Sequence, residues 1–216
     1  MTGAARWDFR RGCFAHTHRI AAESTRRIIE ICASRGAHPF VYIEAPDGRT
    51  MDVYHAAAAM NRAEESFYLE RRHLKLKRFH LCKPVPAYAL ERTLLMFAMG
   101  PRENIEEIAE LIRMSSDCNV SCYPDIFNEN IGNLEIQAPG ISKASAIRSL
   151  AAELGVERTV VFGDNLNDLP MFAIADEAVA VANAEPEVKA AATTIIGPNY
   201  TDAVARFIAA DFRKNF

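Results

Sequence analysis

The segment from Val160 to Phe172 constrains the fold of this 216-residue chain more than any other feature. It begins with an apolar run containing β-branched residues, which ends at Gly163 and is followed by Asp164, Asn167 and Asp168. A short apolar strand that stops at a glycine and leads into a helix is typical of a parallel α/β sheet. Ligands of open α/β sheets bind at the carboxyl ends of the strands, so we expect a polar site there.

The C-terminal part of the chain, from about residue 134, alternates between predicted strands and helices. We expect strands at 133–137, 159–162, 178–182 and 193–196, and helices at 143–154, 169–175, 186–192 and 202–212. Strands that alternate with helices form βαβ units around a parallel sheet. The predicted fold class is therefore α/β, with residues 134–216 forming the C-terminal part of its core.

Residues 1–133 show a different organisation and are predicted to form mainly an α+β domain, with residues 1–12 as a hinge or part of the core. We expect helices at 25–35, 56–68 and 101–114, strands at 94–99 and 119–125, and a hairpin of strands 39–45 and 50–54. The basic segment Arg71–Arg78 either attracts an anionic substrate or is a solvated helix face, and we favour the solvated face.

Composition excludes several classes of function. A net charge of −3 gives no reason to expect nucleic acid as a partner, and no apolar stretch is long enough to predict a membrane span. The five cysteines are scattered and odd in number, without paired metal-ligand spacing or a preceding secretory signal. We therefore expect a reducing, cytoplasmic location.

Three oxygen-bearing side chains after the strand at 159–162 are candidate site residues. A carboxylate at Asp164 suits Mg²⁺, a hard cation that takes oxygen ligands. Asn167 is placed to donate to a phosphate oxygen, and Asp168 to hold a metal-bound water or orient a metal ligand. The alternative for all three is helix capping, for which Asp and Asn are preferred in any case.

Lys143 is the candidate phosphate ligand. A lysine in the first turn of a helix is electrostatically unfavourable, and a residue that breaks a local rule suggests a functional site. A lysine and a helix N-terminus together hold a phosphate well, whereas a lone lysine is simply solvent-exposed. The candidate residues from Asp164 to Asp168 favour phosphate binding by Lys143 over a lone, solvent-exposed lysine. Asn199 and Asp202 line the same sheet edge or form a loop and a cap, and we favour the loop and cap.

These residues lie in motifs that resemble the haloacid dehalogenase superfamily, and its Cof-type sugar-phosphate and cofactor phosphatases most closely. The motifs are Ile141-Ser142-Lys143, Gly163-Asp164-Asn165-Leu166-Asn167-Asp168-Leu169-Pro170-Met171, Val181-Ala182-Asn183-Ala184 and Val188-Lys189. The resemblance implies an incomplete Rossmann-like core, an α+β cap domain and a Mg²⁺-dependent phosphatase of small phosphorylated metabolites. It implies catalytic roles for Lys143 and Asp168, substrate binding by Lys143 and Asn167, and metal binding by Asp164 and Asp168.

One departure from the family matters for activity. Members of the family begin with a strand carrying Asp-x-Asp-Gly-Thr, which supplies the nucleophile and the general acid/base, and no Asp-x-Asp occurs in these 216 residues. The chain resembles a member that lacks this N-terminal segment, so we expect it to be inactive alone and its core sheet to have an open edge that favours self-association. The alternative function is a non-catalytic binding or interaction protein derived from such a phosphatase.

Overall fold

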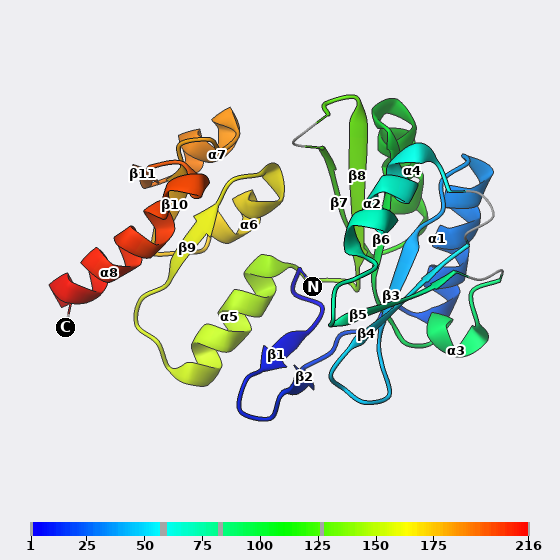
Figure 1. Ribbon diagram of the computed structural model, residues 1–216, viewed down its shortest axis with the longest axis horizontal. Helices are drawn as coiled ribbons and strands as arrows, with labels where there is room; N and C mark the ends of the chain where they lie inside the picture. The colour runs from blue at the N-terminus through cyan, green and yellow to red at the C-terminus, as the bar shows by residue number, and fades with distance from the viewer. Residues whose placement is uncertain (1, 57–59, 82–83, 126–127, 216) are drawn as a thin grey trace. The chain divides into compact units, whose positions relative to one another are not determined.

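The computed structural model describes residues 2–56, 60–81, 84–125 and 128–215. The chain divides into two compact units, Met1–Ser142 and Lys143–Phe216 (Figure 1). The division lies further along the chain than the predicted boundary after residue 133, because strand β8 (Ile131–Gln137) pairs with two strands of the first unit. No helix in the described residues is long and apolar enough to cross a membrane.

The first unit is built on a six-stranded sheet in the order β5-β4-β3-β6-β8-β7. Strands β4 and β5 are parallel, and every other neighbouring pair is antiparallel. The elements are the hairpin β1 (Arg6–Asp8) and β2 (Cys13–Ala15), the helices α1 (Ala22–Ser34), α2 (Arg62–Arg71), α3 (Ala87–Leu90) and α4 (Arg102–Ser115), and the sheet strands β3 (Phe40–Glu44), β4 (Met51–His55), β5 (Lys77–Leu81), β6 (Thr93–Pro101), β7 (Asn119–Pro124) and β8.

The two faces of this sheet bury different side chains, since successive residues of a strand point to opposite faces. On one face, apolar residues such as Met96 and Ile136 pack with Ile28 of α1 and Ile108 of α4. On the other face, an aromatic cluster forms under α2. The centre of the Phe67 ring lies 4.9 Å from that of Phe40 and 4.7 Å from that of Phe97. The predicted hairpin of β3 and β4 and the amphipathic helix α4 are both present.

Helix α2 begins at Arg62 because Asn61 and Glu64 form a capping box. The predicted start of this helix near residue 56 partly lies outside the described residues, which exclude 57–59. The Glu64 carboxylate is fully buried and accepts hydrogen bonds from the amides of Asn61 at 2.9 Å and His38 at 2.8 Å. Its Oε2 lies 3.6 Å from Nε2 of the buried His55, so one carboxylate ties α2 to β4 and to the chain before β3.

The basic segment Arg71–Arg78 is not a helix face, which corrects the prediction. Helix α2 ends at Arg71, and strand β5 begins at Lys77 because its backbone pairs with β4. The Lys77 ammonium lies over the Tyr42 ring, 5.3 Å from its centre, and burial lowers the pKa of Lys77. Arg78 donates to the buried Asp52 carboxylate at 2.9 Å, and its own side chain is 48% exposed. Arg72, His73 and Lys75 are exposed too, so the segment is largely solvated, as we favoured, although it is not a helix face.

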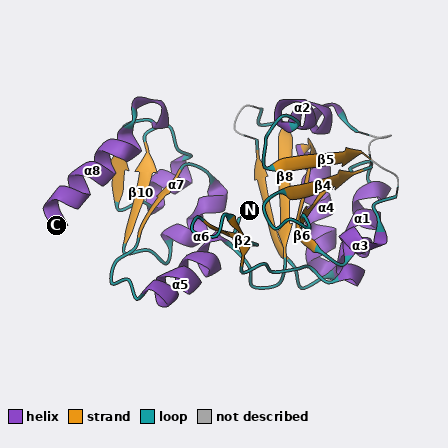
Figure 2. Ribbon diagram, turned by 60° about the horizontal axis from the view of Figure 1, so that its bottom comes forward, coloured by secondary structure: helices purple, strands orange, loops and turns teal. Residues whose placement is uncertain are grey.

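The second unit contains a three-stranded parallel sheet in the order β11-β10-β9 (Figure 2). Its strands are β9 (Val160–Gly163), β10 (Glu177–Val181) and β11 (Thr194–Ile196), and its helices are α5 (Lys143–Leu154), α6 (Leu169–Phe172), α7 (Pro186–Ala191) and α8 (Ala203–Asn215). The alternation of strands and helices predicted after residue 143 is therefore confirmed.

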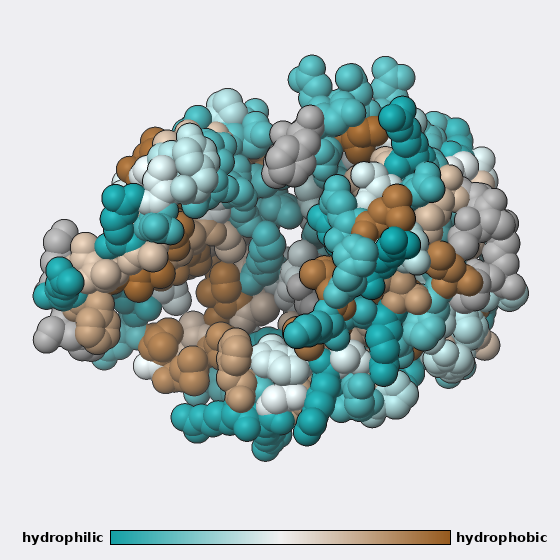
Figure 3. All heavy atoms as spheres, in the orientation of Figure 1, coloured by the Kyte–Doolittle hydropathy of each residue, from teal (hydrophilic) through white to brown (hydrophobic). Residues whose placement is uncertain are grey.

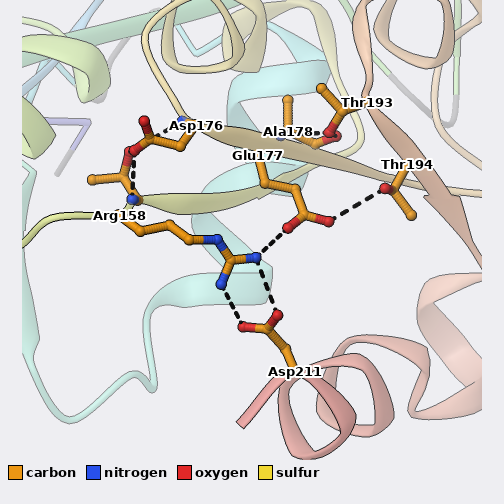
Figure 4. Close-up of polar contacts among 8 residues, drawn as sticks. Arg158, Asp176, Glu177, Ala178, Thr193, Thr194 and Asp211 are labelled. Carbon is orange, nitrogen blue, oxygen red and sulfur yellow. Dashed lines mark hydrogen bonds and ion pairs between the residues drawn. The ribbon is translucent and has the colours of Figure 1, made fainter. Parts of the chain in front are cut away.

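An ionic network fastens α8 at the amino-terminal edge of this sheet (Figure 4). Arg158 precedes β9 and donates to both oxygens of Asp211 in α8, at 2.8 Å and 3.1 Å, and to Glu177 at the start of β10. These carboxylates raise the pKa of Arg158. Thr159 donates through its amide to Asp176 at 2.7 Å, which fixes the turn before β10. The candidate site lies at the opposite, carboxyl-terminal edge of the sheet.

Apolar side chains remain exposed on two helices of the second unit. Leu154 of α5 is 65% exposed, and Ile208 and Phe212 of α8 are 52% and 63% exposed. Figure 3 shows hydrophobic residues gathered along α8 and over the region of α5. Within the described residues, β9 pairs with β10 alone, so its outer edge has no strand beside it.

Replacing the buried carboxylate of Glu64 tests its role in the first unit. We expect Glu64→Ala to lower the free energy of unfolding by about 2–4 kcal/mol, because two half-buried amides lose their acceptor. Glu65→Ala, at an exposed position in the same turn, is the matched control and should change it by less than about 0.5 kcal/mol. Trp7, the single tryptophan, lies in this unit, so urea unfolding followed by its fluorescence reports the change. Equal effects of the two substitutions would contradict this role.

Candidate active site

The ion pair between Lys143 and Asp168 is the centre of the candidate site. Lys143 is the first residue of α5, and its Nζ lies 2.5 Å from Oδ1 of Asp168 and 3.4 Å from Oδ1 of Asn167. The Asp168 side chain is 6% exposed and that of Lys143 is 31% exposed. The carboxylate thus offsets the unfavourable position of a cation at a helix N-terminus and leaves the ammonium partly open to solvent.

Asp168 is held in place by the backbone that follows β9. Its Oδ2 accepts hydrogen bonds from the amides of Asp164 at 3.0 Å and Asn165 at 3.3 Å. Gly163 makes this close approach possible, since a Cβ added there would lie 2.7 Å from both Cβ of Asp168 and Cε1 of Phe172. The glycine at the end of the strand is therefore required by packing against the Asp168 side chain, not by a left-handed backbone.

Asn165, rather than Asp164, caps the short helix that follows the strand. The Asn165 side chain accepts from the amide of Leu166 at 2.6 Å and forms a capping box with Asp168 around the 3₁₀ helix η2 (Leu166–Asp168). The capping interpretation is therefore correct for Asp168, which also carries the ion pair, and does not apply to Asp164 or Asn167. The sequence alone could not rank three neighbouring caps.

The Asp164 carboxylate is left open by these contacts. Its backbone donates to Asp168 and accepts from the amide of Glu185 at 2.9 Å, whereas its half-buried side chain receives no hydrogen bond from the described residues. One open carboxylate matches Mg²⁺, which is usually held by one or two carboxylates and completed by substrate phosphate and water. The described residues contain no cluster of three or more His, Cys, Asp or Glu that could enclose a metal by themselves.

The structure brings together Lys143, Asn167 and Asp168, and it places Asp164 at the same turn through its amide. The loops after β10 and β11 also meet, because the amide of Asn199 donates to Oδ1 of Asn183 at 2.9 Å. Asn199 begins a short 3₁₀ helix, Asn199–Thr201, that follows β11. Asn165 and Asn183 fix the backbone around the site, and sequence reasoning did not assign these roles. The partner of Asn183 lies in another loop, whereas the cap at Asn165 was a local signal that could have been found.

The chain belongs to the haloacid dehalogenase-like hydrolase family, whose profile matches residues 2–208. This match confirms the resemblance to the Cof-type branch that the motifs indicate. The fold class is confirmed too, because solved structures of haloacid dehalogenase-like proteins match nearly the whole chain, with TM-scores of 0.69 and 0.72 for two of them. The haloacid dehalogenase subclass IIB sugar phosphatase BT4131 matches 98% of this chain and 74% of its own, with 18% identity and a TM-score of 0.69.

Curated relatives match shorter segments. The 5-amino-6-(5-phospho-D-ribitylamino)uracil phosphatase YcsE of Bacillus subtilis is 34% identical over 104 residues, which are 47% of this chain and 39% of that protein. The pyridoxal phosphate phosphatase YbhA of Escherichia coli is 40% identical over 77 residues, which are 35% of this chain and 28% of that protein. The matched segment thus spans less than half of the length of each of these relatives.

The site contains two carboxylates, of which Asp168 has structural partners and Asp164 receives no hydrogen bond from the described residues. We expect Asp168→Ala to destabilise the second unit by about 2–4 kcal/mol, because it removes an ion pair and the acceptor of two amides. Asp164→Ala is the matched control, and it should stay within about 0.5 kcal/mol of the unsubstituted chain. Hydrogen exchange of the β9 amides measures the stability of the second unit in both variants. A large loss of protection in Asp164→Ala would show that its carboxylate has a structural partner.

Proposed function

We propose that this chain carries the phosphate-binding and metal-binding part of the active site of a Mg²⁺-dependent phosphatase that acts on small phosphorylated metabolites. The observation that carries the proposal is the Lys143–Asp168 ion pair beside the open Asp164 carboxylate. A partly exposed ammonium at a helix N-terminus attracts a phosphate, and a free carboxylate next to it attracts the cation that accompanies the phosphate.

In this proposal, each side chain has one task. Lys143 and Asn167 bind the phosphate group, since the Lys143 ammonium is 31% exposed and the Asn167 side chain lies 3.4 Å from it. Asp168 positions Lys143 and the turn after β9. Both of its oxygens already accept hydrogen bonds, so it orients a metal ligand rather than binding the metal itself. Asp164 is the direct metal ligand. When bound, Mg²⁺ neutralises charge on the transferred phosphoryl group.

The names of the relatives support the class of substrate. YcsE and YbhA are phosphatases of a ribitylamino-uracil phosphate and of pyridoxal phosphate, both small phosphorylated metabolites. A cytoplasmic location agrees with the four described cysteines, which form no disulfide. The alternative is a non-catalytic binding protein, which the same phosphate and metal ligands would serve. The absence of Asp-x-Asp from these 216 residues favours that alternative for the chain by itself.

Turnover distinguishes the two functions. We expect the 216-residue chain to release no phosphate from a panel of phosphate monoesters at enzymatic rates, because it contains no Asp-x-Asp nucleophile motif. Phosphate release should be measured with and without Mg²⁺. Mg²⁺-dependent turnover of about 1 per second or more would contradict the expectation and reveal another nucleophile in the chain.

Metal binding tests Asp164 directly. We expect weak Mg²⁺ binding by calorimetry, because one carboxylate supplies few of the ligands that the ion needs. Asp164→Asn should abolish that binding without unfolding the second unit. Asp202→Asn, which changes a carboxylate in the loop before α8, is the control and should leave it unchanged. Tight binding that survives Asp164→Asn would place the metal elsewhere.

We also propose that the open edge of β9 and the exposed apolar side chains of α5 and α8 promote self-association. The chain should therefore show a concentration-dependent mass by light scattering, and Leu154→Glu should reduce it because a charge opposes burial of this surface. Met114→Glu is the control, since Met114 is 85% exposed on α4 of the other unit. A monomer at all concentrations that binds no hydrophobic dye would disprove this proposal.

A further inference from the structure

Strand β5 has one free edge. It stands at the end of the six-stranded sheet, and among the described residues it pairs with β4 alone (Figure 2). The amide of Met51 in β4 donates to the carbonyl of Leu76, just before β5, at 2.9 Å. Because the backbone groups of successive strand residues point in opposite directions, those of Phe79 and Leu81 point away from β4. Such groups can pair with a further strand.

The segment that contains this strand has a charge opposite to that of the whole chain. Residues 71–81 contain five Arg and Lys and no Asp or Glu, whereas the chain has a net charge of −3. Arg78 is compensated by the buried Asp52. Arg72 and Lys75 are exposed, and neither forms an ion pair with an acid of the described residues. The free edge is therefore bordered by cations without an anionic partner.

Exposed leucines alternate with these cations. Leu74, Leu76 and Leu81 are 47%, 53% and 42% exposed. Charges alone protect an edge strand against aggregation. Leucines beside the charges add apolar surface that a bound strand can cover, so this edge has the groups needed for strand addition.

Charge decides between two occupants of this edge. A second copy of the chain, paired through its own β5, would bring two sets of cations together, and like charges across a strand pair are destabilising. An extended segment that alternates acidic and apolar residues would set carboxylates against the cations and apolar side chains against the leucines. The edge is therefore complementary to an acidic strand.

We propose that β5 binds an acidic, extended segment of a partner protein, which joins the sheet as a further strand. The outward backbone groups of Phe79 and Leu81 supply hydrogen bonds to that segment, and Arg72 and Lys75 select it by charge. This interaction goes beyond the proposed phosphatase chemistry, because it uses none of the residues of the phosphate and metal site.

The test uses the full chain, isotope-labelled for nuclear magnetic resonance. The probe is a synthetic peptide of about eight residues, the length of a strand, in which glutamate and valine alternate. We expect the peptide to shift the backbone resonances of residues 72–81. Its affinity should fall about tenfold when the salt concentration rises from about 0.05 M to about 0.5 M, because salt screens exposed charges.

A charge-reversed variant tests the cations. Arg72→Glu combined with Lys75→Glu should weaken the affinity about tenfold, because two attractions become repulsions. Arg26→Glu combined with Arg27→Glu, at exposed positions on α1, makes the same change in net charge. This control should bind the peptide unchanged.

A proline tests the backbone. Leu81→Pro removes an amide that points away from β4, a substitution that edge strands tolerate, and it should also weaken binding. Leu81→Val keeps the amide and is its control. Should Leu81→Pro fail to fold, the charge-reversed variant decides alone.

Three results would overturn the proposal: no shift with the acidic peptide, equal binding of a peptide with lysine in place of glutamate, or an unchanged affinity of the Arg72 and Lys75 variant. Shifts of residues 77–81 that grow with protein concentration, without peptide, would assign the edge to a second copy of the chain and overturn it as well.

Discussion

The contact between the Asp168 carboxylate and the turn after β9 supports the rest of the second unit's site. This carboxylate is nearly excluded from water, and an ammonium and two amides compensate its burial. The same contact fixes the first turn of α5 through Lys143 and requires a glycine at position 163. One buried acid therefore orients the cation and the open carboxylate at Asp164.

The first unit contains a comparable buried carboxylate, Glu64. A buried carboxylate again caps a helix and accepts backbone amides, here linking α2 to the chain before β3. With α2 fixed in this way, its Phe67 packs against Phe40 of β3 and Phe97 of β6.

The proposed chemistry follows from this division of tasks. The second unit has the charges that suit a phosphate and its metal ion. Membership of the haloacid dehalogenase-like hydrolases agrees with a phosphate-binding role for the second unit. Because Asp-x-Asp is absent from these 216 residues, we expect phosphate and metal binding to be measurable on this chain without turnover.

The sequence by itself determined the α/β character of the second unit and the candidates Lys143, Asp164, Asn167 and Asp168, because strand-to-helix turns and local charge are properties of consecutive residues. Tertiary structure decided which of the two carboxylates pairs with Lys143, because that lysine lies 25 residues before Asp168 in the chain. It also decided that residues 131–137 belong to the first unit and that Lys77 and Arg78 lie in a strand, because strand pairing is set by neighbours far along the chain.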